Sequence, residues 1–431
     1  MAQQATPTAG RQRVAARLVS GVRASDALRS AAVSFLLTRT AVLCVAIFAA
    51  VSMSPGREGG IGAHNAARYD VPALTHPLGG VGDELLSPLA RWDAVWFLGI
   101  ADHGYGHAAA GRAAFFPLYP LAVRAVAELG GGSRGDLLVA AYLVSLAAFA
   151  AALYLLHRLV ALELGRPAAR TTLVLLAVFP ASLYFGAPYS ESLFLLASVG
   201  GFYAARTGRW AWAGVAAAAA AGTRSAGVLL LLPLAAIYVR ERGWRPGRDA
   251  AWLLLGPLGL GAFALYLGFA HGDALAFLDV QHAWYRHFAG PLGGVWDGLV
   301  AGVEGARQLL SGSREPVYFR EAGGDPFRVA GMNLMLLGFL VFALVGSWGV
   351  WRRLPLPYAL WTAVALLLPL SFPVGPQPLM SLPRFLSVLF PLFMWLALEC
   401  EERRWTQWVA PAFAVGLGVF TEQFATWHWL A

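Results

Sequence analysis

Long apolar runs recur along this chain, and polar segments of very unequal length separate them. A helix needs about 20 apolar residues to cross the hydrocarbon core of a bilayer, with a range of about 17–25. Runs that meet or approach this length cover 31–53, 136–156, 171–187, 251–270, 329–350, 356–372, 385–400 and 406–420. The pattern therefore predicts a polytopic membrane protein built from helices.

Three further runs, 189–205, 210–222 and 226–239, are also candidate spans. The last two are short, and Thr223-Arg224-Ser225 separates them, so they form either one bent hairpin or two broken helices. Polar backbone at that depth has to be buried in protein or face a cavity. Counting all the runs gives an all-α fold of about 11 spans, and totals from nine to twelve fit the same pattern.

Basic residues near the span ends favour the cytoplasmic side of a membrane. With residues 1–30 as a cytoplasmic arm, the inner segments hold 18 of the 32 basic residues. They are Arg11, Arg13, Arg17, Arg23, Arg29, Arg158, Arg166, Arg170, Arg206, Arg209, Arg240, Arg242, Arg245, Arg248, Arg352, Arg353, Arg403 and Arg404. Residues 31–431 then form one transmembrane domain, with long extracytoplasmic loops at 54–135 and 271–328.

The first long loop has its own hydrophobic pattern. The pattern predicts amphipathic helices at Leu89 to Gly104 and at Phe115 to Leu129. Aromatic side chains favour the headgroup region of a membrane, so we expect these helices to lie in the interface plane. The aromatic residues expected at that depth are Trp92, Trp96, Phe97, Phe115, Phe116 and Tyr119.

Composition supports the membrane class. Hydrophobic residues make up 58% of the chain and charged residues 13%, whereas about 25% of a soluble protein is charged. The net charge of +8 does not indicate a nucleic-acid partner, because the arginines follow the membrane topology. All 32 basic residues are arginine, which with the abundant Ala and Gly suggests a bacterial host with a GC-rich genome and thus a plasma-membrane location.

Ionisable groups beside spans are costly and indicate functional sites. The first such group is Arg91-Trp92-Asp93, followed by Asp102-His103-Gly104-Tyr105. An outward carboxylate at Asp93 can act as a general base, or it can cap the helix that begins at Ala94. Asp93 and Asp102 are nine residues apart, about half a turn out of phase on one helix, so they share a site only if that helix ends or bends.

Three more outward groups lie next to apolar runs. Glu191, in Tyr189-Ser190-Glu191-Ser192, either binds a sugar hydroxyl or stabilises the first turn of the next helix. Arg224 suits bidentate recognition of phosphate, or it reaches a lipid headgroup as a snorkelling side chain. Arg384 opens an apolar run from the outer side, against the charge bias, which favours a specific anionic partner.

A metal site is not expected. His282 and His287 lie five residues apart rather than the three or four that place two ligands on one helical face. The two cysteines, Cys44 and Cys400, have no metal-ligand spacing and predict no disulfide framework. We therefore expect no cofactor.

Taken together, these motifs resemble the GPI mannosyltransferase 2 (PIG-V) family. The first match is the stretch from Arg91-Trp92-Asp93 to Asp102-His103-Gly104-Tyr105, which resembles the signature of that family's first luminal loop. The later matches, in the family's order, are Phe115-Phe116-Pro117-Leu118-Tyr119-Pro120, Pro180-Ala181-Ser182, Tyr189-Ser190-Glu191-Ser192-Leu193-Phe194, Ala221-Gly222-Thr223-Arg224-Ser225 and Pro383-Arg384-Phe385. The resemblance runs from about Arg91 to Arg240 and is weaker beyond.

The resemblance implies a GT-C-like fold and a glycosyltransferase that works on the extracytoplasmic side with a polyprenyl-phosphate-linked sugar. It implies Asp93 as the base of an inverting mannosyl transfer and Arg224 or Arg384 as the group for the donor phosphate. The other residues that it marks for substrate binding are Arg91, Trp92, Asp102, His103, Tyr105, Tyr189 and Glu191. A bacterium is not expected to make GPI anchors, so we expect an envelope glycolipid, a lipoglycan or a protein as the acceptor.

Two other functional classes fit part of the pattern. A transporter or lipid flippase would explain the spans and the arginines beside them, but no internal repeat of the kind found in many transporters is evident. A non-catalytic subunit that scaffolds envelope enzymes is the third reading, and it would tolerate replacement of Asp93.

Overall fold

The computed structural model describes residues 9–53, 60–106, 110–290, 292–314, 325–375 and 377–430, with side chains of the first helix from residue 24 onward. Within these ranges the chain forms helices and one isolated β-bridge, between Arg286 and Val374.

The α-helices are α1 (Ala9–Ser52), α2 (Ile61–Tyr69), α3 (Pro72–Thr75), α4 (Gly80–Leu86), α5 (Asp93–His103), α6 (Leu118–Ala127), α7 (Arg134–Glu163), α8 (Arg166–Val178), α9 (Glu191–Arg206), α10 (Trp210–Thr223), α11 (Leu231–Arg242), α12 (Leu258–His271), α13 (Ala276–Asp279), α14 (Gly293–Ser311), α15 (Pro326–Arg353), α16 (Leu356–Leu370), α17 (Leu382–Ser387), α18 (Phe390–Arg403) and α19 (Thr406–Ala425). The 3-10 helices are η1 (Ser87–Leu89), η2 (Ala110–Ala114), η3 (Pro180–Phe185), η4 (Ser225–Leu230), η5 (Arg248–Leu255) and η6 (Val280–Trp284).

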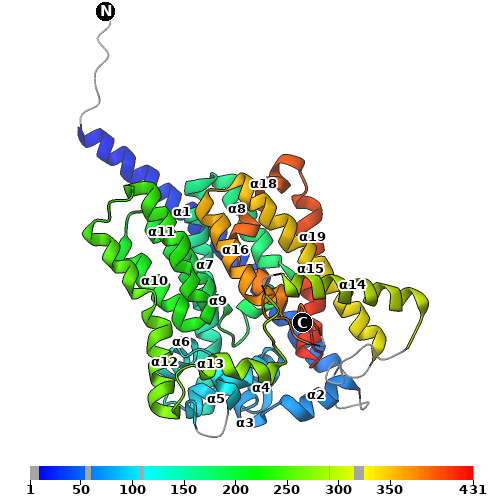
Figure 1. The fold of residues 1–431 in the computed structure, drawn as a ribbon. Coiled ribbons are helices and arrows are strands. Elements are labelled where there is room, and N and C mark those ends of the chain that lie inside the picture. Colours follow the sequence, from blue (N-terminus) through cyan, green and yellow to red (C-terminus); the bar gives the residue numbers. More distant parts are fainter. Residues whose placement is uncertain are drawn as a thin grey trace, which may run out of the picture.

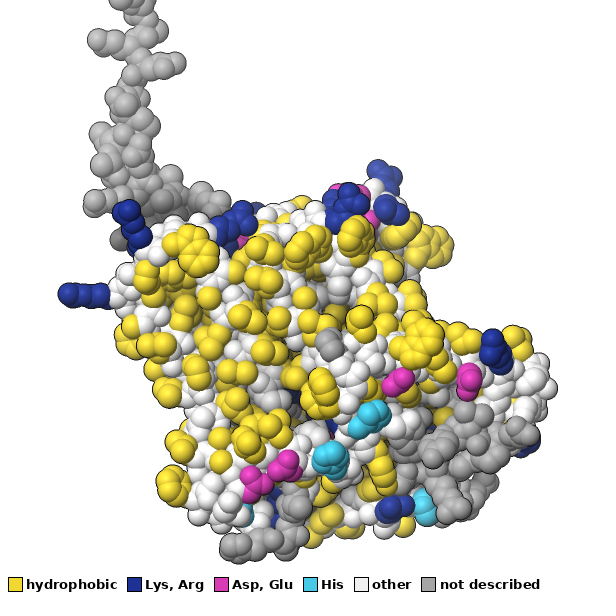
Figure 2. Space-filling view, in the orientation of Figure 1, with side chains coloured by type: hydrophobic (Ala, Val, Ile, Leu, Met, Phe, Trp, Pro, Cys, Tyr) yellow, Lys and Arg dark blue, Asp and Glu magenta, His cyan; other side chains and the backbone are white. Residues whose placement is uncertain are grey.

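The long helices form a bundle, and the short helices α2 to α5 and α13 gather at one end of it (Figure 1). Figure 2 shows mostly hydrophobic side chains over the middle of the visible face, with Arg side chains gathered at the rim opposite the short helices. Such a band is what contact with lipid requires, because lipid tails solvate apolar surface and not charge. The predicted all-α membrane fold is confirmed.

Each of the eleven predicted runs coincides with one or more of these helices. Among the described residues, four helical stretches are long and apolar enough to cross a membrane: Ala24–Ser52, Arg134–Glu163, Arg248–His271 and Pro326–Arg353. The total of eleven spans stays a prediction, because several other helices are too short for this criterion; α10, for example, has 14 residues.

Segments predicted to be cytoplasmic meet at one end of the bundle. Arg166 donates a hydrogen bond to Asp26 (2.9 Å), and Thr171 donates one to Glu401 (2.8 Å). Arg353 pairs with Glu399 at 3.0 Å. These contacts join α1 at Asp26 to the ends of α8, α15 and α18, so the structure groups the segments as the arginine pattern predicts.

The break at Thr223-Arg224-Ser225 is a hairpin. Helix α10 ends at Thr223, Arg224 is extended (φ −155°, ψ 149°), and η4 leads into α11. A Cβ on Gly227 would lie 2.0 Å from the carbonyl carbon of Ala220, so only glycine allows η4 to fold back against α10. This packing holds Arg224 at the turn of the hairpin.

The aromatic residues of the first long loop do not act mainly as membrane anchors. Phe97, Phe115, Phe116 and Tyr119 are at most 8% exposed and pack in the protein core. The ring of Phe97 meets those of Phe115 and Tyr119 edge to face, each at 5.1 Å. These four side chains therefore do not anchor the loop in lipid, because the loop helices fold onto α7 and bury their apolar faces in protein.

Candidate active site

Asp93 is the first residue of α5, at the end of the bundle where the short helices gather. Trp92 before it has φ 55°, which is uncommon for a residue with a side chain. Its ring is held edge to face against those of Trp427 (5.4 Å) and Trp429 (4.9 Å). The fixed conformation of Trp92 sets the direction in which α5 starts and therefore where Asp93 lies.

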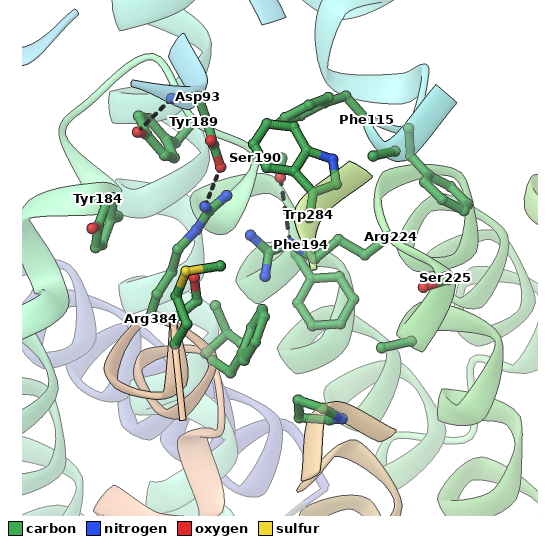
Figure 3. A pocket seen from close by; sticks show the side chains of 18 of the residues that line it. Asp93, Phe115, Tyr184, Tyr189, Ser190, Phe194, Arg224, Ser225, Trp284 and Arg384 are labelled. Atoms are coloured by element: carbon green, nitrogen blue, oxygen red, sulfur yellow. Dashed lines mark hydrogen bonds and ion pairs between the residues drawn. The ribbon is translucent and has the colours of Figure 1, made fainter. Parts of the chain in front are cut away.

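The hydroxyl of Tyr189 ties the start of α5 to the segment before α9. It accepts a hydrogen bond from the backbone N–H of Asp93 and donates one to the backbone carbonyl of Arg91, both at 3.0 Å. Tyr189 is 1% exposed, and Figure 3 shows its hydroxyl beside Asp93. The two sequence motifs, some 96 residues apart, therefore form one site.

The carboxylate of Asp93 forms an ion pair with Arg384 of α17 (Figure 3). Asp93 lies inside α5 rather than before it, and its carboxylate points to Arg384, so the alternative role as the helix cap does not fit the geometry. Arg384 also stacks over the ring of Tyr189 at 4.7 Å. The guanidinium fixes the position of the carboxylate in the site.

Glu191 joins Arg384 to Arg224. It is fully buried at the first turn of α9 and forms ion pairs with both guanidinium groups. Burying a charge is costly unless it is paired, and here the two carboxylates of Glu191 and Asp93 balance the two guanidinium groups of Arg224 and Arg384. Glu191 therefore acts within the protein and does not line a cavity.

Two cavities meet at Asp93. The core cavity, about 460 Å³, lies between α9, α10, α16 and α17 and includes Arg224, Arg286 and Arg384 in its wall. The loop cavity, about 620 Å³, lies among residues of the two long loops, including Arg68, Trp96 and Arg112. The residues that line both cavities are Trp92, Asp93, Trp284, Met380 and Trp429.

Arg286 is a site residue that the sequence interpretation missed. Its Nη1 donates to the carbonyl of Phe372 (3.1 Å), and the guanidinium lies over the ring of Phe385 at 5.8 Å. Among the described residues no carboxylate forms an ion pair with it, and burial lowers its pKa to about 10, so it stays charged near neutral pH. The only indication in the sequence was its position in the predicted second outer loop, between His282 and His287, which were considered as metal ligands.

Trp427 and Trp429 were also missed. Trp427 is buried, and the guanidinium of Arg91 lies 4.9 Å from its ring centroid. The indole N–H of Trp429 is buried without a hydrogen-bond partner in the described part of the chain, at the wall that the two cavities share. The signal available was a Trp-His-Trp stretch, separated by six residues from the apolar run 406–420.

The structure divides the predicted binding residues into two groups. Trp92, Tyr189, Arg224 and Arg384 line the core cavity, and His103 lines the loop cavity beside Trp92. The remaining four, which line neither cavity, are Arg91, Asp102, Tyr105 and Glu191.

All four residues outside the cavities have structural contacts, and those of Glu191 are described above. Arg91 is buried and forms an ion pair with Asp70 at 3.8 Å, and burial lowers its pKa. Tyr105 donates a hydrogen bond to the carbonyl of Phe115 (2.7 Å), and Asp102 accepts one from Arg134 (2.8 Å). Because α5 is continuous from Asp93 to His103, Asp93 and Asp102 point in different directions.

Within the described ranges, no three His, Cys, Asp or Glu side chains cluster closely enough to hold a metal ion. The chemistry that the described residues can provide is that of one carboxylate at the junction of two cavities, with three guanidinium groups in the wall of one of them.

Comparison with known proteins agrees with the motifs. The family model described as mannosyltransferase (PIG-V) matches residues 61–242. A GPI alpha-1,6-mannosyltransferase 2 from Mus musculus is 35% identical over 178 residues, which is 39% of this chain and 36% of the mouse protein. The match thus spans little more than a third of that relative's length.

Two solved structures have a weak likeness to the fold. An oligosaccharyltransferase from Archaeoglobus fulgidus is 15% identical with a TM-score of 0.39, over 74% of this chain and 45% of that one. ArnT from Cupriavidus metallidurans is 16% identical with a TM-score of 0.36, over 77% and 75%. Likeness of this degree assigns no role to individual residues. The resemblance predicted from the motifs is confirmed by the family model and the mouse relative, and over residues 61–242 this chain is similar to the PIG-V mannosyltransferases.

Proposed function

We propose that this protein is a mannosyltransferase that moves mannose from a polyprenyl-phosphate donor to an acceptor hydroxyl on the extracytoplasmic side of the membrane. Asp93 is the general base of the reaction. The observation that carries the proposal is the position of Asp93 at the junction of the core cavity and the loop cavity. A transferase for two substrates needs this arrangement, because its base has to reach the acceptor hydroxyl while the donor occupies a second site.

The core cavity suits the donor. Arg286 brings a positive charge that no described carboxylate neutralises by an ion pair, and apolar side chains such as Leu368 and Phe385 lie in the same wall. A polyprenyl phosphate combines an anionic group with an apolar chain, so one cavity with both features fits it. Arginine is well suited to phosphate, since its guanidinium donates two parallel hydrogen bonds.

The reaction balances without a further reactant. The acceptor hydroxyl gives its proton to a carboxylate oxygen of Asp93 while its oxygen forms a bond to C1 of mannose. The bond between C1 and the phosphate oxygen breaks, and polyprenyl phosphate leaves with the electron pair, stabilised by Arg286. Attack from the face opposite the phosphate inverts C1, so a β-linked donor gives an α-mannoside.

The comparisons support the choice of mannose and of a transferase. The matching family model is described as a mannosyltransferase, and the mouse relative is named as a GPI alpha-1,6-mannosyltransferase. The same match favours transfer over transport or a scaffolding role. We keep the acceptor as an envelope glycolipid, lipoglycan or protein.

The donor and the side of the membrane are tested together. The purified full chain in proteoliposomes is given radiolabelled undecaprenyl-phosphate mannose or GDP-mannose, with total envelope lipids as acceptor. We expect transfer from the lipid-linked donor alone. To test the side, a membrane-impermeant thiol reagent is applied to intact cells expressing Arg68→Cys, and labelling is expected only if the loop cavity faces outward.

Transfer from GDP-mannose would contradict the proposed donor. Labelling of the same variant only in inverted vesicles would contradict the proposed side of the membrane.

A further inference from the structure

The loop cavity is rich in positive charge. Arg68, Arg112, Arg134 and His103 all line it, and Asp93 is the acidic residue in its wall. The carboxylate of Asp93 is already paired with Arg384 of the core cavity. The charge of the loop cavity therefore depends on which of its basic groups have other partners.

Two of the basic groups share one carboxylate. Asp102 lies 2.8 Å from Arg134 and 3.3 Å from the ring of His103. Arg68 and Arg112 differ, because among the described residues neither forms an ion pair with a carboxylate. Arg112 donates one hydrogen bond to the carbonyl of Gly104 (3.1 Å), and Arg68 lies 5.3 Å from the ring centroid of Tyr69.

Both guanidinium groups keep donors for a ligand. A guanidinium has five N–H donors, and Arg112 uses one of them in the contact just described. A cavity of about 620 Å³ that ends at the proposed base and holds two such arginines is built for a negatively charged molecule.

We propose that the loop cavity is the acceptor site and that the acceptor carries an anionic group, a phosphate or a carboxylate, which Arg68 and Arg112 bind. This assignment rests on the proposed function for the role of Asp93. The aromatic rings of Tyr69, Trp96 and Tyr285 in the same wall provide apolar faces for the sugar or polyol that presents the hydroxyl. The anionic group then fixes how far the acceptor enters, and its hydroxyl reaches Asp93.

The experiment measures binding and needs no turnover. The purified full chain in nanodiscs of neutral phosphatidylcholine is saturated with undecaprenyl phosphate, so that the core cavity is occupied. Binding of mannose 6-phosphate, mannose and inorganic phosphate is then measured by calorimetry. The proteins compared are the wild type, the double variant Arg68→Gln/Arg112→Gln, and the control Arg124→Gln, which removes an outer arginine paired with Glu128 away from the cavity.

We expect mannose 6-phosphate to bind the wild type and Arg124→Gln at least about tenfold more tightly than mannose does, since hydrogen bonds to charged groups are the stronger ones. The double variant should lose this difference. Binding of inorganic phosphate as tight as that of mannose 6-phosphate would indicate a free-anion site and overturn the acceptor assignment. Equal affinity for the charged and the neutral sugar, or an unchanged preference in the double variant, would overturn the anionic specificity.

A second arm uses lipids and separates this proposal from the proposed function. Transfer from undecaprenyl-phosphate mannose is measured onto phosphatidylinositol, which is anionic, and onto monoglucosyl diacylglycerol, which is neutral. We expect transfer to the anionic lipid, with its KM raised about tenfold in the double variant. Transfer to the neutral lipid alone contradicts the anionic acceptor but keeps the mannosyltransferase, whereas failure of the wild type to bind undecaprenyl phosphate contradicts the proposed function and not the anion site.

Discussion

The hydroxyl of Tyr189 accepts a hydrogen bond of 3.0 Å from the backbone N–H of Asp93, which fixes the start of α5 against the segment that leads into α9. The same hydroxyl donates to the carbonyl of Arg91, so it satisfies two polar groups at once in a buried place. Asp93 is positioned through its backbone by Tyr189 and through its carboxylate by Arg384.

Replacing Tyr189 with phenylalanine should lower kcat about tenfold or more and leave the KM for the donor nearly unchanged. The variant loses the hydrogen bond that sets the start of α5, and a small displacement of a catalytic group has a large effect on rate. Its stability should fall by about 1 kcal/mol, the net value of a typical hydrogen bond. Steady-state transfer kinetics and thermal unfolding in detergent measure both effects.

Tyr119→Phe is the matched control for Tyr189→Phe. Tyr119 is equally buried and donates to the carbonyl of Ala141 (3.0 Å), but it lines neither cavity. It should lose similar stability and keep its kcat. A kcat loss of the same size in both variants would show that Tyr189 contributes only to folding.

Arg286→Gln should raise the KM for the lipid-linked donor about tenfold, because a charge-assisted hydrogen bond to the phosphate is worth about 1.5–3 kcal/mol. Arg286→Lys should restore part of the affinity. The control is Arg307→Gln, an exposed arginine of α14 that lines neither cavity. If the donor KM is unchanged in Arg286→Gln but raised in Arg224→Gln, the donor phosphate binds Arg224, as the sequence resemblance implied, and not Arg286.

Two glycines of α12 should respond in opposite ways to alanine. A Cβ on Gly259 would lie 2.1 Å from the carbonyl oxygen of Ala218 on α10, whereas a Cβ on Gly261 would have no atom within 4 Å. We expect Gly259→Ala to destabilise the protein by about 1–3 kcal/mol, since the two helices would have to separate. Gly261→Ala should be neutral or stabilising by up to about 1 kcal/mol. Equal unfolding midpoints for the two variants would contradict the close packing of α10 and α12.

The helical fold could be predicted from the sequence because apolar runs of this length have few alternatives in a membrane. The arginine pattern also predicted that the inner segments lie together, and Asp26, Arg166 and Glu401 do lie at one end. The apolar pattern did not show whether Phe97 and Phe115 face lipid or pack inside the protein. Both environments are apolar, so the same residues suit either.

The candidate site was predictable only where a motif marked it. Asp93, Arg224 and Arg384 stood out because each interrupts or borders an apolar run. Arg286 lies in a long loop. Its place in the core cavity depends on the β-bridge to Val374. These two residues are 88 positions apart, so no local sequence pattern predicts their contact. Glu191 was found, but its pairing with two arginines depends on the positions of three segments that are far apart in the sequence.

The most direct test of the account is the transfer of mannose from undecaprenyl-phosphate mannose by the wild type and by Asp93→Asn. The substitution keeps the shape of the side chain and removes the base, which is worth about 10²–10⁴-fold in rate. Asp273→Asn, at an exposed carboxylate that caps a turn of the second long loop and lines neither cavity, is the control. We expect Asp93→Asn to lose nearly all transfer while its expression and its binding of undecaprenyl phosphate match the wild type. Transfer by Asp93→Asn at the rate of the wild type would remove Asp93 from the mechanism and contradict the account.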